Sequence, residues 1–240
     1  MLNGMSIRIH LMDGDAEGRL SAEFVTRVVR AYKIPRTKVL KSGDLDDLHT
    51  PAVYFLLGDD DTGKSPEGKR VYIGETEDPL ERFGNHLSKK DWWNEAIILV
   101  ASNGFLNKAH VKYLESRFTA IAGEASRYEV DYSRDSNQPK LTKADIDELE
   151  GFIADARLLI PTLGHRFLEP FVKKTAPTQN NSVEEADGEL FYLRRDMAVG
   201  KRTNEGFVVL KGAKIKSKLV PSAADFVKNS RDKYQNLIVD

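Results

Sequence analysis

Apolar positions near the start of the chain follow first the period of a strand and then the period of a helix. Residues 5–12 alternate apolar and polar side chains, which is typical of a half-buried strand. Ser21 is a suitable helix N-cap, and the helical spacing after it stops before Pro35. The apolar positions of this predicted helix are Phe24, Val25, Val28, Val29 and Tyr32. We therefore expect a small strand–helix unit over residues 1–49.

From residue 50 onward, three short apolar runs predict strands. The runs at 52–57 and 70–74 are joined by a loop rich in Asp, Gly and Pro, which indicates a long hairpin. The run at 96–101 is almost wholly apolar, as in a central buried strand. Together they predict a three-stranded antiparallel sheet.

Helix signals lie between and after these runs. Asp78 followed by Pro79 marks a helix start, because the aspartate accepts backbone N–H groups and proline fits the first helical position. Helical spacing also marks residues 108–124, and residues 143–160 follow a Thr-x-x-Asp pattern close to a capping box. We predict a mixed α/β (α+β) fold over residues 50–172, with helices flanking the sheet.

The composition and the apolar pattern change in the last third of the chain. Residues 173–188 are polar and aperiodic, which predicts a linker. Beyond it, the pattern predicts a small separate C-terminal α/β domain over residues 189–240, with three strands and a helix. These elements are placed at 190–193, 206–210, 213–218 and 223–233. The chain stops soon after that helix, so a complete and an incomplete domain both stay open.

Composition narrows the class of protein. The chain of 240 residues is 40% hydrophobic and 30% charged, as globular proteins are, and no apolar run approaches the roughly 20 residues of a membrane helix. There is no cysteine, which removes disulfides and thiol nucleophiles and suits a reducing compartment. The first residues also lack the pattern of a secretory signal. We expect a cytoplasmic protein without membrane contact.

Candidate chemistry is concentrated in the predicted sheet domain. Arg82 and His86 are four residues apart, so they share one face of the helix after Asp78. Glu115 lies at the edge of an apolar helical stripe, where a carboxylate needs a partner or a metal ion. Tyr54 and Tyr72 come from neighbouring strands, and a buried phenol needs a hydrogen-bond partner.

The order and spacing of these residues resemble the GIY-YIG nuclease family over about 90 residues. The matching positions are Ala52-Val53-Tyr54, Tyr72-Ile73-Gly74, Arg82, His86, Glu115 and Asn137. The resemblance implies an endonuclease that hydrolyses phosphodiester bonds in DNA. It implies that Glu115 holds one Mg²⁺ or Mn²⁺ ion and that Arg82 binds the scissile phosphate. It also implies supporting roles for Gly74 and Asn137.

The identity of the general base stays open among three groups. The resemblance implies that Tyr72 or Tyr54 takes the proton of the attacking water, with His86 assisting or acting as the base itself. A phenol with a pKa near 10 has to overcome about 4 kcal/mol to act as a base at pH 7. An unperturbed histidine, with a pKa near 6.5, meets almost no such barrier, so we keep His86 among the catalytic residues.

Two departures from the family pattern suggest an alternative. The first motif begins with alanine instead of glycine, and Glu75 stands where some members have a lysine. The net charge of −1 gives little general attraction for nucleic acid, and the largest local excess of positive charge, 11 Lys and Arg against 7 Asp and Glu, lies in residues 186–240. The alternative is a nucleic-acid-binding module with the same fold and little or no activity.

Other candidate sites have structural explanations beside the functional ones. The region around residues 205–212 resembles a small uncharacterised domain that accompanies bacterial GIY-YIG proteins. Near it, alternating lysines are either phosphate contacts or protection of a sheet edge; they are Lys214, Lys216 and Lys218. Trp92-Trp93 either stacks on a base or packs against the third strand.

Residues 58–65 match a phosphate-binding loop in form, which gives a third hypothesis, a nucleotide-binding protein that uses Lys64. That motif requires a helix directly after it. Pro66-Glu67-Gly68 follows instead, and three consecutive aspartates would repel phosphate. We therefore interpret the segment as the hairpin loop.

Overall fold

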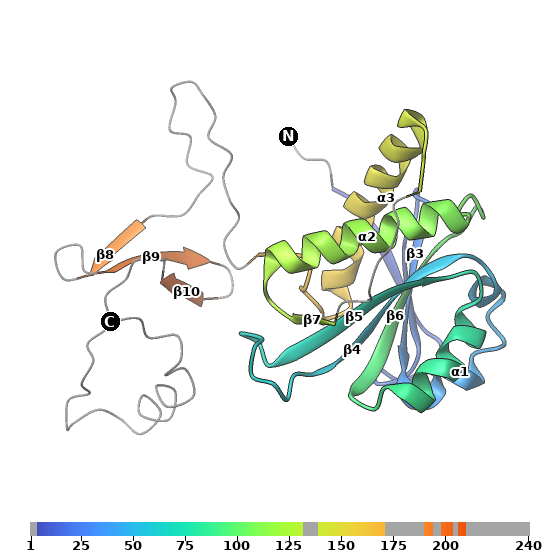
Figure 1. Cartoon of the computed structure of the whole chain (residues 1–240), viewed down its shortest axis with the longest axis horizontal. Helices are drawn as coiled ribbons and strands as arrows, with labels where there is room; N and C mark the ends of the chain where they lie inside the picture. The colour runs from blue at the N-terminus through green and yellow to red at the C-terminus, as the bar shows by residue number, and fades with distance from the viewer. Residues whose placement is uncertain (1–3, 132–138, 171–189, 194–197, 204–205, 210–240) are drawn as a thin grey trace. The chain divides into compact units, whose positions relative to one another are not determined.

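The computed structural model describes residues 4–131, 139–170, 190–193, 198–203 and 206–209. Its main part is a sheet with the strand order β1-β2-β3-β6-β4-β5-β7 (Figure 1). The strands are β1 (Ile7–Leu11), β2 (Leu20–Phe24), β3 (Val29–Pro35), β4 (Ala52–Asp59), β5 (Lys69–Thr76), β6 (Trp93–Ala101) and β7 (Glu129–Asp131). The helices are α1 (Pro79–Lys89), α2 (Lys108–Ala125) and α3 (Lys143–Thr162), and two 3₁₀ segments are η1 (Arg36–Lys41) and η2 (Asp46–His49).

The prediction of a three-stranded antiparallel sheet is wrong. The three predicted strands exist as β4, β5 and β6, but they are part of a seven-stranded sheet. The sheet is also mixed, because β5 pairs with β7 in parallel while its other pairs are antiparallel. The N-terminal segment therefore extends the main sheet.

The helix predicted after Ser21 is also wrong, since this stretch forms β2, a turn and β3. β3 pairs with β6 along its whole length, from Val29 opposite Ala101 to Pro35 opposite Glu95. That pairing buries Ala31 and Ile34 completely, on opposite faces of the sheet. A helix would satisfy its own backbone but would leave that edge of β6 exposed, so tertiary pairing overrides the local periodicity.

Side chains of alternating residues divide the core into two layers on the two faces of the sheet. On one face, Val53 and Phe55 of β4 pack with Leu114 and Phe118 of α2, and α3 adds to the same layer. On the other face, Tyr54 and Tyr72 pack with Phe83 of α1 and with both 3₁₀ segments. Figure 1 shows α2 and α3 close together and α1 apart from them. We call these the α2 face and the α1 face.

Local signals correctly located the helix starts. The Asp78 carboxylate caps α1 by accepting a hydrogen bond from the backbone N–H of Glu81. Thr142 and Asp145 form a full capping box at the start of α3. That helix continues one residue beyond Pro161, which was predicted to end it.

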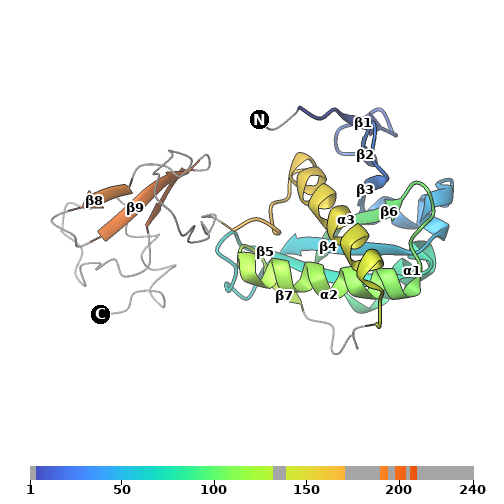
Figure 2. The same ribbon diagram turned by 90° about the horizontal axis from the view of Figure 1, so that it is seen from above.

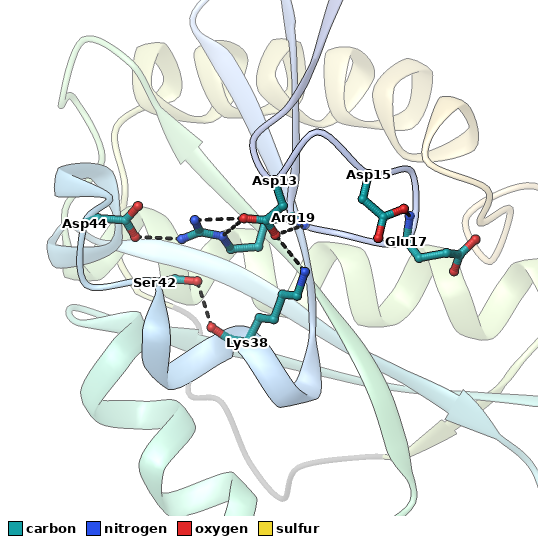
Figure 3. A network of polar contacts seen from close by, with 7 residues as sticks. All are labelled: Asp13, Asp15, Glu17, Arg19, Lys38, Ser42 and Asp44. Carbon is teal, nitrogen blue, oxygen red and sulfur yellow. Dashed lines mark hydrogen bonds and ion pairs between the residues drawn. The ribbon is translucent and has the colours of Figure 1, made fainter.

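A charged network joins the turn between β1 and β2 to the 3₁₀ segments (Figure 3). The Asp13 carboxylate accepts hydrogen bonds from the backbone and side chain of Arg19 and from Lys38 Nζ at 2.9 Å. Arg19 also bonds Asp44 at 2.7 Å. The backbone N–H of Arg19, followed by the Lys38 and Arg19 side chains, holds the pKa of Asp13 well below its usual range. This network fixes β1 and β2 to the rest of the sheet.

Contacts divide the chain into Met1–Pro170 and a second unit that begins at Phe171. The second unit contains an antiparallel sheet of β8 (Leu190–Leu193), β9 (Ala198–Thr203) and β10 (Gly206–Val209), in the order β10-β9-β8. The predicted strands at 190–193 and 206–210 are confirmed. The predicted linker 173–188, the strand 213–218 and the helix 223–233 lie outside the described residues. Among the described helices, none has the length and apolar character of a membrane span.

Candidate active site

Three predicted site residues form a hydrogen-bonded chain on the α1 face. Arg82 Nε lies 3.1 Å from Tyr54 Oη, and Tyr54 Oη lies 2.6 Å from His86 Nε2. Arginine N–H groups only donate, so the Tyr54 oxygen accepts from Arg82. The Tyr54 hydroxyl thus joins the guanidinium of Arg82 to the imidazole of His86.

The arrangement follows from the way α1 leaves β5. Asp78 caps α1 two residues after β5 ends, so the first turns of the helix lie against the sheet. Phe83, completely buried, packs edge-on against Tyr54 with ring centroids 5.2 Å apart. Arg82 and His86 on either side of it reach the Tyr54 hydroxyl. The predicted sharing of one helix face is confirmed.

Tyr72 completes this group from the neighbouring strand. Tyr54 lies opposite Gly74 in the β4–β5 register, so Tyr72 is its diagonal neighbour on the same face. The Tyr54 and Tyr72 ring centroids are 6.1 Å apart, and the Tyr72 and His86 ring centroids are 5.2 Å apart. The structure thus brings together Tyr54, Tyr72, Arg82 and His86.

Gly74 has a packing role in the same place. A Cβ atom added at this position would overlap the hydroxyl oxygen and ring of Tyr54. The absence of a side chain is therefore what allows the Tyr54 phenol to cross β5 and reach Arg82 and His86. This gives a physical reason for the glycine of the Tyr-Ile-Gly motif.

Burial and nearby cations keep His86 and Tyr54 uncharged at neutral pH, while positively charged side chains surround them. Burial, then the charges of Arg82, Lys90 and Lys89, lowers the pKa of His86 to about 4. Burial raises the pKa of Tyr54 well above its usual value. At neutral pH the imidazole is therefore uncharged and Tyr54 is protonated. The expectation of an unperturbed histidine is wrong, and His86 is a weaker base than that expectation assumed.

Arg82 is the cation best placed to bind an anion. Its side chain is exposed, and no ion pair with a carboxylate is found for it in the described part of the chain. Arg30 and Arg117, by comparison, bond Glu23 and Glu150 at 2.7 and 2.6 Å. A planar guanidinium held through Nε by a phenol can offer its remaining N–H groups to a phosphate.

Lys90 is a site residue that the sequence analysis missed. Its Nζ lies 4.3 Å from the centroid of the Tyr72 ring and 2.6 Å from the Asp131 carboxylate. Arg70 reaches the same carboxylate at 3.3 Å. Two cations thus share one anion beside Tyr72. The signal in the sequence was the Lys89-Lys90 pair at the end of the predicted helix, but its neighbours became known only from the fold.

Glu115 has a different position from the other four residues. It is half-buried on α2, and the apolar stripe of that helix packs on the opposite face of the sheet. α2 crosses β5, and β7 pairs only with Arg70–Tyr72 of that strand. The helix that carries Glu115 therefore lies on the other side of the sheet from the face where Tyr54, Tyr72, Arg82 and His86 meet.

Glu75 does not bring negative charge to the α1 face. It follows Gly74 in β5, so its side chain points to the α2 face. There its carboxylate bonds Lys108 Nζ at 2.8 Å. Glu75 therefore places no negative charge beside Arg82.

Several other predicted residues add nothing to this site. Asn137, Lys214, Lys216 and Lys218 lie outside the described residues. Trp93 is buried in the core and Trp92 packs with Arg70, whose guanidinium lies 4.6 Å from its ring. Within the described residues there is no group of three or more His, Cys, Asp or Glu that could hold a metal ion. A hollow of about 450 Å³ lies among β1, β2 and β3 and contains none of the predicted site residues.

The β4–β5 loop is a hairpin connection, as interpreted, and no helix follows it. The Asp60 carboxylate accepts hydrogen bonds from the backbone N–H groups of Thr62 and Ser65, at 2.9 and 2.7 Å. An aspartate occupies the backbone donors of the loop, so nucleotide binding has no support here.

Comparisons with known protein families, with curated proteins and with solved structures found no match for this chain.

Proposed function

We propose that the chain is a GIY-YIG-type endonuclease that hydrolyses phosphodiester bonds in DNA with the help of a divalent cation. The observation that carries the proposal is the meeting of Tyr54, Tyr72, Arg82 and His86 on one face. These residues come from two strands and a helix, and they are the ones to which the resemblance gives catalytic roles. A phosphate-binding guanidinium beside phenol and imidazole groups is suited to phosphoryl transfer.

Arg82 binds the scissile phosphate in this proposal. The phosphoryl oxygens gain negative charge as water attacks, and a positive group at that point stabilises the transition state. Lys89 and Lys90 add positive charge near the same point, and these charges, after burial, contribute to the low pKa of His86. The site therefore favours an anion although the whole chain carries a net charge of −1.

Tyr72 is the better candidate for contact with the attacking water. The Tyr54 side chain is completely buried, and its hydroxyl is already hydrogen-bonded to both Arg82 and His86. Tyr72 keeps 6% of its surface exposed. We assign Tyr54 to positioning Arg82 and His86, and we assign Tyr72 to proton transfer.

A metal ion would be held by Glu115. Mg²⁺ and Mn²⁺ accept carboxylate oxygen and retain several waters, so one carboxylate is a sufficient protein ligand. Glu115 is half-buried on α2, and α2 packs against β5. The ion would supply charge stabilisation to the phosphate and a more acidic bound water.

Cleavage of supercoiled plasmid DNA with Mg²⁺ tests the proposal. Arg82→Ala, Tyr72→Phe and Glu115→Gln are each expected to slow cleavage by about 100-fold or more, since each removes a transition-state contact. Arg157→Ala, an exposed arginine of α3, is the matched control and should cleave at the wild-type rate. Cleavage that persists in both Arg82→Ala and Tyr72→Phe would contradict the assignment.

The second candidate is a nucleic-acid-binding module without hydrolysis. The position of α2 on the opposite face favours it, because Glu115 then has to extend around β5 to reach the phosphate. This function predicts DNA retention without cutting and weaker retention in Arg82→Ala. It also predicts no effect of Glu115→Gln on retention, whether Mg²⁺ is present or absent.

A further inference from the structure

β1 is an edge strand of the main sheet. It pairs with β2 on one side, and in the described part of the chain no strand pairs with its other side. Figure 2 shows β1 at the end of the sheet far from β7. An edge of this kind presents a row of backbone donors and acceptors to another strand.

The hydrogen bonds to β2 identify which groups point outward. Met12 N–H donates to Arg19 O at 3.0 Å, and Val25 N–H donates to Ser6 O at 3.3 Å. Bonded residues alternate along an antiparallel pair, so the even-numbered residues of β1 bond β2. The N–H and C=O groups of Ile7, Ile9 and Leu11 therefore point away from the sheet.

β1 carries little protection against strand pairing. It has no lysine, proline or bulge; its sequence is Ile-Arg-Ile-His-Leu, in which Arg8 is the one charged residue, and its register with β2 is regular. Ile9 and Leu11 are 48% and 45% exposed. The outer edge of β1 therefore offers a partner strand both backbone hydrogen bonds and apolar contact.

The pattern of β1 is symmetric about Ile9. Apolar residues occupy positions 7, 9 and 11, and the polar Arg8 and His10 lie between them. An antiparallel partner of the same sequence, centred on Ile9, places Ile7 opposite the partner's Leu11. It places apolar side chains on one face and polar side chains on the other, and a shift by one residue would mix the two.

We propose that the chain forms a homodimer in which β1 pairs antiparallel with β1 of a second copy, with Ile9 on the two-fold axis. Every outward backbone group of Ile7, Ile9 and Leu11 then has a partner, because bonded pairs exchange both N–H···O bonds. The interface is isologous, as in most homodimers. The proposal does not depend on nuclease activity.

Sedimentation equilibrium of the full chain tests the dimer. The wild type is expected to show twice the monomer mass as concentration rises. Ile9→Lys should remain a monomer over the same range, since a charge at the axis meets its own copy. Leu40→Lys is the matched control, because Leu40 is 60% exposed on η1, and it should dimerise like the wild type.

Single-cysteine variants test the register, and the chain has no cysteine of its own. In the proposed pair, Cα atoms at position 9 are about 5.5 Å apart, which a disulfide can bridge. Oxidised Ile9→Cys should therefore become a covalent dimer. Leu11→Cys should not, since its two copies are about 13 Å apart along the strands. A monomeric wild type, or a dimer in which Leu11→Cys cross-links and Ile9→Cys does not, would overturn the proposal.

Discussion

At residue 74 the chain has no side chain, and the phenol of Tyr54 occupies the space that a methyl group would need. Gly74→Ala is therefore expected to lower the free energy of unfolding by about 1–3 kcal/mol, since either β5 or Tyr54 has to move. The same change should weaken the bond between Tyr54 and His86. Urea denaturation measures the stability, and plasmid cleavage reports on the site.

Gly84 provides the control for that substitution. It lies in α1, and an added Cβ there meets no atom within 4 Å. Gly84→Ala is expected to stabilise the fold by about 0.5–1 kcal/mol through helix propensity. Equal effects at the two glycines would contradict the packing role of Gly74.

The low pKa of His86 predicts that the protein loses stability at mildly acidic pH. The pKa of the folded state is about 4, below the value of about 6.5 in an unfolded chain, so below pH 6.5 the unfolded state binds the proton first. The stabilising contribution is complete above pH 6.5 and decreases as the pH falls toward 4. Between pH 7 and pH 5 the wild type should lose on the order of 2 kcal/mol more than His86→Gln.

Urea unfolding at several pH values checks this difference. Gly84→Ala, in the same helix as His86, serves as the control, because it introduces no titratable group. It should show the same pH dependence as the wild type. Parallel curves for the wild type and His86→Gln would mean that His86 is not buried in its neutral form.

Among the elements, the end of α1 depends on one arginine of η1. Arg36 donates to the carbonyl oxygens of Lys90, Leu87 and Trp93 at 2.6, 3.1 and 3.3 Å. Its guanidinium also lies 4.6 Å from the Trp93 ring centroid. This residue joins the last turn of α1 to the start of β6, and thereby fixes the helix that carries His86.

Arg36→Met is expected to destabilise the chain by about 1–3 kcal/mol, because three carbonyl groups lose their donor. Amide hydrogen exchange should become faster in the last turn of α1. Arg117→Met removes a more exposed pair with Glu150 and should cost less than about 1 kcal/mol. If the two variants were equally stable, Arg36 would have no special role.

Local sequence signals predicted those elements whose formation does not depend on contacts with residues distant in the sequence. Asp78 and the capping box at Thr142 located two helix starts because capping is a contact within one turn. The apolar runs of β4, β5 and β6 likewise predict strands, because each run is a property of a few consecutive residues. The apolar pattern of residues 21–32 fits the period of a helix as well as that of a strand, because it is short and contains β-branched residues. Pairing with β6 is what makes the second half of this stretch a strand.

For the whole molecule, the position of β3 predicts how the chain can be divided. β6 lies between β3 and β4, so a fragment that begins at residue 50 exposes one edge of a strand whose residues 96–101 are all apolar. We expect residues 1–170 to unfold in one cooperative transition and residues 50–170 to aggregate or remain unfolded. Thermal unfolding followed by circular dichroism distinguishes these outcomes. A cooperative transition in the shorter fragment would show that the N-terminal strands are dispensable.

The candidate site was predictable in part. Arg82 and His86 could be paired from their spacing because a helix places residues i and i+4 together regardless of the fold. Tyr54 and Tyr72 could be placed on adjacent strands. The contact of Lys90 with Tyr72 and the position of Glu115 on the opposite face depend on the side of the sheet on which each helix packs. Helical spacing does not encode that side.

The sequence by itself determined the helix caps and the strands β4, β5 and β6, because these features result from contacts or periodicity within a few residues. It also determined that Arg82 and His86 share one helix face, while their association with Tyr54 and Tyr72 was implied by the family resemblance. The tertiary structure decided that the sheet has seven strands, that β3 lies beside β6, and that α1 and α2 cover opposite faces. The physical reason is that an alternating strand shows which side chains it buries. Its neighbours are selected by competition among all the edges that the chain has to cover.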